Sequence, residues 1–362
     1  MKANQKPLDQ QVVVLTGASS GIGLATARKL AERGAAVFAI ARNEKALRNL
    51  VAEIEGIGGR AAYHVADIGV QAEVIAAAQA ATARFGGFDT WINDAGVSIY
   101  GHLWEQPIEE ARRLFDTNYW GQVYGSLSAL EHLKDKGGTI ITVGSVLSDF
   151  SIPLQGQYCA AKHAVKAFTN NLRMEVMETK LPVAVTLIKP SAIATPFPEH
   201  AISHMEQPGK LPPPLYAPEI VADAIVYACE HPVREFTVGS AGKAQTLLYN
   251  WAPWLAEPLF AAVGPTLQKE KREVEGGKIN LDQPGTGGRA QGAQHFIRKS
   301  SLFLEAQKRP RLSVAITGGI AAATVAAMAI NGALRTEGKV RRRVRAARER
   351  DIRKLHGLKL SA

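Results

Sequence analysis

Short β-rich runs alternate with helical patterns through the first two-thirds of the chain, and this alternation constrains the fold more than any other feature. Several runs, such as VVVL at 12–15 and VFAIA at 37–41, are almost continuously apolar, as strands buried on both faces must be. Parallel strands are joined by right-handed helical crossovers. The sequence therefore predicts an α/β fold with one doubly wound parallel sheet between two layers of helices.

The pattern also gives bounds for the elements and parts of the chain. The expected strands are 11–16, 36–41, 61–66, 90–93, 139–144, 183–189 and 235–238. The expected helices are 22–33, 44–54, 71–84, 108–119, 157–178 and 218–230. We expect one α/β domain (1–240) and then a mostly helical extension. The expected parts of the extension are an aromatic-rich and polar part (241–311, loosely ordered from 264), an uncharged segment (312–334) and a basic tail (335–362).

A glycine-rich turn, TGASSGIG at 16–23, lies between the first expected strand and the first expected helix. Such a turn lets the backbone approach a pyrophosphate closely, while the helix N-terminus faces the negative charge. A tight turn without a ligand can have the same spacing, but the position at the first βα turn favours a dinucleotide site. The candidate contacts are Gly17, Ser19, Ser20, Gly21, Ile22 and Gly23.

The end of the second expected strand indicates which dinucleotide binds. An acidic residue there would bind the ribose 2′-hydroxyl of NAD, whereas this chain has Arg42, whose guanidinium suits a 2′-phosphate. We therefore expect NADP, although an arginine at a helix start can also be a solvated side chain. Asp67, after the third strand, suits either a hydrogen bond to the adenine amine or an ordinary helix N-cap.

Tyr158 and Lys162 lie four residues apart in an expected helix, so they share one face. A nearby ammonium and the positive ring of an oxidised nicotinamide would favour the phenolate and lower the pKa of Tyr158. Ser145 ends an apolar strand at the carboxyl edge of the sheet, where ligands bind in such folds. Its hydroxyl can hydrogen-bond a substrate oxygen whose charge changes during the reaction.

The chain resembles the single-domain branch of the short-chain dehydrogenase/reductase family through TGASSGIG, NDAG at 93–96, Asn118, Ser145 and YCAAK at 158–162. The resemblance covers residues 11 to about 240 and implies a Rossmann-type fold. It implies that Tyr158 is the general acid/base and that Lys162 lowers its pKa and binds the nicotinamide ribose. It also implies that Ser145 orients the substrate oxygen and that Asn118 holds a water in a proton relay. The further cofactor contacts that it implies are Asn93, Ala95, Gly96, Tyr158, Lys162, Pro190 and Thr195.

Two positions depart from the family pattern. Asp94 stands where the family's NNAG has its second asparagine, and we expect it to alter the support of the strand without touching the chemistry. Ser191 follows Pro190 where the family has glycine, so we expect a stiffer turn under the nicotinamide. Neither change removes a catalytic group.

The substrate side of the site is expected to be apolar. The family's variable substrate loop corresponds to 191–216, where we expect His200 and His204 to lie at the loop surface, because Tyr158 already fills the acid/base role. The residues expected near the pocket are Val146, Leu147, Phe150, Ile152, Leu154 and Gln155. They include no arginine, so a small, neutral, lipophilic ketone, aldehyde or alcohol fits better than a charged substrate.

The positive charge is concentrated at the C-terminal end. The net charge is +10, and residues 306–362 hold 14 Lys and Arg against 3 Asp and Glu. Since the remainder is close to neutral, we expect no nucleic acid as a partner. With two cysteines, Cys159 and Cys229, and no clustered Cys and His, we expect neither a disulfide framework nor a metal site.

Residues 312–334 are 23 in number and carry no charge, which is long enough to cross a hydrocarbon core. We expect membrane contact through this segment and the basic tail, the alternative being an alanine-rich helix packed on the domain. Without an apolar leader, the α/β domain is expected at the cytoplasmic face of a membrane, or soluble in the cytoplasm. Trp251, Trp254 and Phe260 indicate either an interfacial strip or a helix over the substrate pocket or at a subunit contact.

Together these features predict an NADP(H)-dependent oxidoreductase that transfers a hydride between the nicotinamide and a neutral, lipophilic carbonyl or alcohol. A redox-neutral epimerase or dehydratase of the same fold remains open. A non-catalytic scaffold bound to a membrane or to nucleic acid through the basic tail also remains open. The family resemblance further implies a homo-oligomer.

Overall fold

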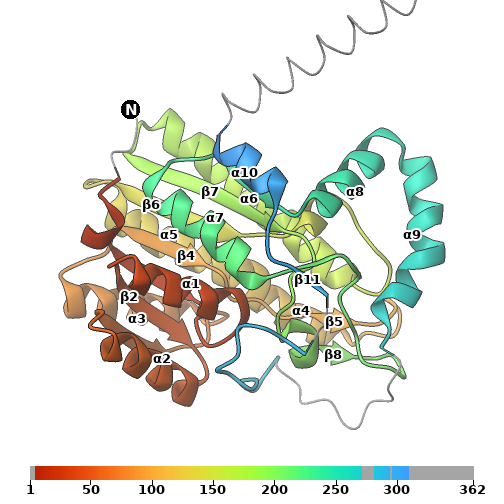
Figure 1. Ribbon diagram of the computed structural model, residues 1–362, viewed down its shortest axis with the longest axis horizontal. Helices are drawn as coiled ribbons and strands as arrows, with labels where there is room; N and C mark the ends of the chain where they lie inside the picture. The colour runs from red at the N-terminus through yellow and green to blue at the C-terminus, as the bar shows by residue number, and fades with distance from the viewer. Residues whose placement is uncertain (1–4, 271–280, 294–295, 310–362) are drawn as a thin grey trace, which may run out of the picture. The chain divides into compact units, whose positions relative to one another are not determined.

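Seven parallel strands form the central sheet of the chain (Figure 1). A computed structural model describes residues 5–270, 281–293 and 296–309. The strands are β1 (Val12–Thr16), β2 (Ala36–Ala41), β3 (Ala61–Val65), β4 (Thr90–Asn93), β6 (Gly138–Val143), β7 (Val183–Pro190) and β10 (Glu235–Val238). Their order is β10-β7-β6-β4-β1-β2-β3, and every neighbouring pair is parallel. The predicted α/β fold class is confirmed.

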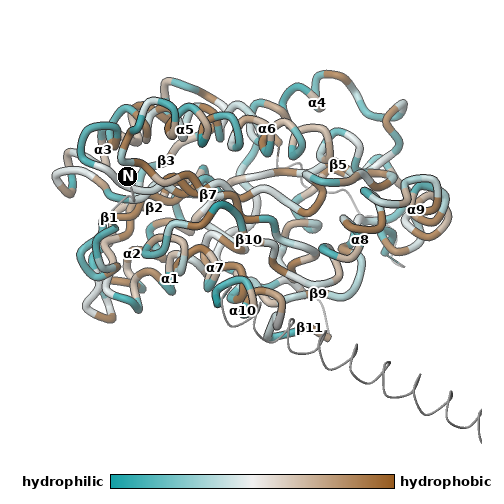
Figure 2. Tube along the Cα trace, turned by 90° about the horizontal axis from the view of Figure 1, so that it is seen from above, coloured by the Kyte–Doolittle hydropathy of each residue, from teal (hydrophilic) through white to brown (hydrophobic). Residues whose placement is uncertain are grey.

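Helices cover both faces of this sheet, as Figure 2 shows from above. One face packs on α1 (Gly21–Glu32), α2 (Glu44–Gly56) and α7 (Pro218–Glu230), and the other on α3 (Gln71–Phe85), α5 (Gly121–Leu133) and α6 (Gly156–Glu178). Alternate residues of β1 enter the two cores, Val13 and Leu15 on the first face and Val14 on the second. All three are fully buried, which is why the strand reads as a continuous apolar run.

The sheet order places a candidate ligand site beside β1. From β1 the chain moves outward to β2 and β3, and it then returns to the other side of β1 to form β4. At such a switch point the crossovers on the two sides diverge, which leaves a crevice at the carboxyl ends of the strands.

The prediction of one continuous α-helix over 108–119 is wrong. The segment is α4 (Ile108–Phe115), followed by a π-helical turn over Asp116–Trp120 that leads into α5. The wider turn accompanies a buried contact, since the side-chain amide of Asn118 accepts from the Val97 N–H and donates to the Val97 carbonyl oxygen, both at 2.8 Å. Such turns are frequent at functional sites.

The described extension is more ordered than expected. It contains α8 (Ser240–Trp251), α9 (Pro253–Gln268) and α10 (Leu302–Lys308), and residues 281–293 pack against the α/β domain. The short strands β5 (Ile99–Tyr100) and β8 (Ile202–Ser203) pair with each other, as do β9 (Leu215–Tyr216) and β11 (Ile297–Arg298). The chain divides into two compact units between Leu304 and Glu305.

The segment 312–334 and the basic tail 335–362 lie outside the described residues. Within the described residues, no helix is both long enough and apolar enough to span a membrane.

Candidate active site

The glycine-rich turn at 16–23, termed the phosphate turn below, joins β1 to α1. Gly17 and Gly21 have positive φ angles of 76° and 57°, a conformation that favours glycine. A Cβ at Gly23 would lie 2.3 Å from the carbonyl oxygen of Gly17. The sequence thus folds into a tight turn in which the backbone at the start of α1 borders the cavity directly.

A cavity extends from this turn along the carboxyl edge of the sheet. Fourteen of the predicted site residues line it, namely Gly17, Ser19, Ser20, Gly21, Ile22, Arg42, Asp67, Ala95, Gly96, Ser145, Tyr158, Lys162, Pro190 and Thr195. The fold therefore brings the predicted cofactor contacts and three predicted catalytic residues to one continuous site.

Three predicted residues do not line this cavity. Gly23 instead packs closely against the carbonyl oxygen of Gly17 within the turn. The buried Asn93 side chain accepts from Trp91 Nε1 at 2.8 Å and donates to Ser126 Oγ at 2.9 Å, so it supports α5 and does not face the cavity. Asn118 binds the backbone of Val97, so its role in holding a water stays a prediction.

Ser145, Tyr158 and Lys162 meet at the end of β6. Ser145 precedes the short 3-10 helix Val146–Ser148, and α6 carries the other two residues. The side chains of Ser145 and Tyr158 both line the cavity, and Ser145 lies close enough to act on the pKa of Tyr158. Lys162 Nζ lies 5.7 Å from the centre of the Tyr158 ring and donates to the Val143 carbonyl oxygen at 2.9 Å. A substrate oxygen near the Tyr158 hydroxyl could therefore also be reached by Ser145.

The residues of the chain do not lower the pKa of Tyr158, contrary to our expectation. Burial raises this pKa above its usual range, and the Ser145 side chain opposes the rise. Burial also lowers the pKa of Lys162 to about 8. The residues of the chain thus keep Tyr158 as a protonated acid, and a positive charge brought into the cavity would favour its phenolate.

Asp94 lies closer to the chemistry than we expected from the sequence. It lines the cavity, and its Oδ2 lies so near Gly23 that a Cβ there would be 2.9 Å away. Burial raises the pKa of Asp94 to about 7, while the charge of Lys162 lowers it. The carboxylate in turn raises the pKa values of both Lys162 and Tyr158. Asp94 therefore lies at the cavity itself, where it acts on the pKa values of two predicted catalytic residues.

Arg42 borders the cavity at the end of β2, as predicted. Its Nη1 donates to the Leu281 carbonyl oxygen at 2.6 Å and lies 3.7 Å from the carboxylate of Asp67. Arg113, on α4, also pairs with Asp67 and lies 3.5 Å from Asp282. Sequence reasoning missed Arg113 and Asp282, because nothing local in the sequence shows that α4 and the extension meet at this point.

The other end of the cavity is mainly apolar. Its lining residues include Val146, Leu147, Phe150, Ile152, Phe197, Leu211, Pro212, Pro213 and Pro214, together with Gln155 and Gln245. Leu154, expected here, is buried without lining the cavity. His200 is partly exposed and lines the cavity, and burial lowers its pKa. His204 pairs with Glu110 at 2.6 Å and does not line the cavity.

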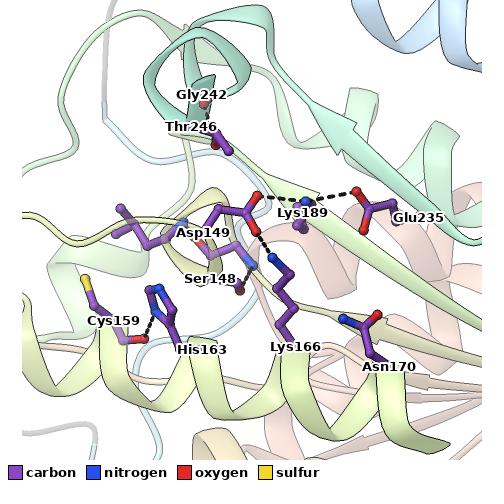
Figure 3. Close-up of polar contacts among 12 residues, drawn as sticks. Ser148, Asp149, Cys159, His163, Lys166, Asn170, Lys189, Glu235, Gly242 and Thr246 are labelled. Carbon is purple, nitrogen blue, oxygen red and sulfur yellow. Dashed lines mark hydrogen bonds and ion pairs between the residues drawn. The ribbon is translucent and has the colours of Figure 1, made fainter. Parts of the chain in front are cut away.

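A buried ion-pair network joins the loop between β6 and α6 to its neighbours (Figure 3). Asp149 lies 2.5 Å from Lys166 of α6 and 2.7 Å from Lys189 of β7, and Lys189 lies 3.0 Å from Glu235. The side chains of Asp149 and Lys189 are 5% and 3% exposed. Lys166 shares a face of α6 with Tyr158 and Lys162, so the network braces the loop that carries Ser145 against that helix.

Comparisons with known proteins agree with this arrangement. The family model described as short chain dehydrogenase matches residues 11–206. The uncharacterised oxidoreductase YxnA of Bacillus subtilis is 41% identical over 326 residues, which are 89% of this chain and 92% of that protein.

Two solved structures share the fold. An alcohol dehydrogenase from the archaeon Thermococcus sibiricus, complexed with 5-hydroxy-NADP, has 28% identity and a TM-score of 0.56, and the match covers 63% of this chain and 95% of that one. A short chain dehydrogenase/reductase from Burkholderia phymatum, in complex with NAD, has 25% identity and a TM-score of 0.63, with 69% and 96% covered. The sequence match, the sheet order and the residues at the cavity lead to one conclusion: this chain belongs to the short-chain dehydrogenase family of oxidoreductases.

Proposed function

We propose that this protein is an NADP(H)-dependent oxidoreductase that transfers a hydride between the nicotinamide and a neutral, lipophilic carbonyl or alcohol substrate. The observation that carries the proposal is that Ser145, Tyr158 and Lys162 line one cavity that continues to the phosphate turn, with Lys162 Nζ 5.7 Å from the centre of the Tyr158 ring.

The residues present fit a dinucleotide. The close approach of Gly23 to Gly17 forms a cradle that a side chain at position 23 would fill, and the start of α1 presents a positive dipole end to a pyrophosphate. When bound, the nicotinamide supplies or accepts the hydride.

The chain's own residues would handle the proton and the substrate oxygen. During reduction Tyr158 donates its hydroxyl proton to the carbonyl oxygen, and during oxidation it accepts the proton of the alcohol. Ser145 holds the same oxygen by a hydrogen bond. The ammonium of Lys162 stabilises the phenolate that Tyr158 becomes after it gives up its proton.

Two features support NADP as the cofactor and a neutral, lipophilic substrate. Arg42 borders the cavity at the ribose end, and its planar guanidinium suits a phosphate, which favours NADP over NAD. The opposite end is lined by aliphatic, aromatic and proline side chains with two glutamines, which favours a neutral, lipophilic substrate.

The test is oxidation of NADPH and NADH, followed at 340 nm with a panel of lipophilic ketones and aldehydes. We expect turnover with NADPH and a loss of about 10²- to 10⁴-fold in kcat for Tyr158→Phe, because the proton donor is removed. Tyr227→Phe, on α7 and away from the cavity, is the matched control and should keep wild-type activity. Substrate conversion without net change of NADPH would indicate an epimerase or dehydratase instead.

We also propose that the enzyme works at the cytoplasmic face of a membrane. Large apolar side chains of α8 and α9 are exposed, among them Trp251 at 85% and Trp254 at 75%. The inner side of α9 packs Phe260 against the cavity residue Phe150, with ring centres 5.6 Å apart. A membrane surface bound by these helices would lie next to the apolar end of the cavity, and the basic C-terminal tail would favour anionic lipid.

A further inference from the structure

Residues 281–293 of the extension, termed the C-terminal strap, return to the phosphate turn. The Gly288 N–H donates to the Ser19 carbonyl oxygen at 2.8 Å, and the Gly21 N–H donates to the Arg289 carbonyl oxygen at 3.0 Å. In Figure 1 the strap is the blue segment that passes α1. Backbone hydrogen bonds therefore fix it to the strand side and to the helix side of the turn.

A second set of contacts fixes the strap at the ribose end of the cavity. The Asn43 side-chain N–H donates to the Gly285 carbonyl oxygen at 2.9 Å, and Arg42 donates to that of Leu281 at 2.6 Å. The Leu281 side chain is 2% exposed and belongs to the apolar cluster that includes Tyr158. One end of the strap is thus inserted into the domain.

A third set joins the strap to the substrate loop. Arg289 pairs with Glu199 at 2.5 Å, and Thr286 Oγ1 lies 3.1 Å from His200 Nε2. The Gly292 N–H donates to the Ala194 carbonyl oxygen at 3.1 Å. The strap therefore connects the parts of the site that would hold the two ends of a dinucleotide.

The strap forms a wall of the cavity. Pro284, Gly285 and Thr286 line the same cavity as the phosphate turn and Tyr158. Gly287 packs so closely that a Cβ there would lie 2.4 Å from the Cβ of Ala46 and 3.1 Å from the Ser19 carbonyl oxygen. The strap can pack this closely against Ala46 and Ser19 only because residue 287 has no side chain.

We propose that the C-terminal strap closes over a bound dinucleotide and retains it, so that cofactor exchange requires the strap to open. The proposal rests on the proposed function, since it needs a dinucleotide in the cavity. It assigns cofactor retention to residues beyond the matched family region, which ends at residue 206.

The first test measures NADPH dissociation by stopped-flow fluorescence in the full-length protein. We expect Gly287→Val to raise the dissociation rate about tenfold, because the added side chain lifts the strap from Ala46. Gly56→Val is the matched control, since a Cβ at Gly56 would meet nothing within 4 Å, and it should release NADPH at the wild-type rate. Thermal unfolding checks that both variants are folded.

Exchanging the charges of Glu199 and Arg289 tests a strap contact that lies outside the cavity, because neither residue lines the cavity. We expect Glu199→Arg and Arg289→Glu each to raise the dissociation rate about threefold, and the double variant to restore it. Hydrogen exchange of the peptide covering 281–293 should slow when NADPH is added.

Three results would contradict the proposal, and each has a different meaning. Faster exchange of the strap with NADPH, or tighter NADPH binding by Gly287→Val, would mean that the strap competes with the cofactor, which overturns the proposal. Unchanged release in all strap variants would overturn it while leaving the proposed function intact. A wild-type protein that binds neither NADPH nor NADH would overturn both.

Discussion

Asp94 is the residue whose chemistry departs most from the family pattern. Its carboxylate disfavours the phenolate of Tyr158 and favours the ammonium of Lys162, so it raises both pKa values. Asp94→Asn removes the charge and keeps a side-chain oxygen. Because the pKa of Tyr158 falls when this charge is removed, Tyr158 loses its proton at a lower pH.

We therefore expect the pH profile of kcat/KM for alcohol oxidation to shift down by about one unit in Asp94→Asn. The pKa of Asp94 is about 7, so the two proteins should differ above this pH and converge below it. Asp135→Asn, at an exposed position, is the control for a simple change in net charge. Coincident profiles for wild type and Asp94→Asn would contradict this role.

At the scale of elements, the Asp149 network ties the loop after β6 to α6 and β7 and thereby fixes Ser145 relative to Tyr158. Burial would raise the pKa of Asp149, but hydrogen bonds from Lys166 and Lys189 outweigh it and lower this pKa. A carboxyl with a lower pKa in the folded state stabilises the fold above its unfolded pKa, and this contribution is lost as the pH falls through the folded pKa.

Asp149→Ala should lower the free energy of unfolding by about 3–5 kcal/mol at neutral pH, because Lys189 keeps a buried charge with one partner fewer. Urea unfolding measures the loss, and the variant should lack the part of the acid destabilisation that wild type shows below about pH 4. Glu131→Ala breaks the exposed pair with Lys134, in which Glu131 is 75% exposed, and should cost about 1 kcal/mol or less. Equal losses in the two variants would show that the network does not stabilise the fold.

At the scale of the whole molecule, the prediction concerns the membrane. We expect the full-length protein to co-sediment with phosphatidylcholine vesicles that contain phosphatidylserine, and to do so less at high salt. Trp251→Ser combined with Trp254→Ser should weaken binding about tenfold or more, because two large apolar side chains no longer enter the interface. Trp104→Ser, at a position 81% exposed and outside α8 and α9, is the control. Protein that stays in the supernatant with these vesicles would contradict the proposed location.

The sequence by itself determined the sheet and most of the site. A strand buried on both faces is largely apolar, as β2 is. The strands β2, β4 and β10 have the predicted bounds, and the other four differ by one residue at one or both ends. Because parallel strands present their carboxyl ends at one edge, the residues after β1, β2 and β6 had to meet there. The apolar pattern and the motif order therefore sufficed to bring Gly17, Arg42 and Ser145 to one cavity.

Only the tertiary structure decided what surrounds these residues. The strap contacts Arg42 and Asn43 across more than 230 residues of chain, mostly through backbone atoms that every residue type possesses. Three further placements likewise depend on which elements become neighbours. The Asn93 side chain hydrogen-bonds α5, Asp94 lies near Lys162, and His200 lines the cavity. A local pattern reports burial and backbone preference, whereas these contacts depend on the path of the chain between distant segments.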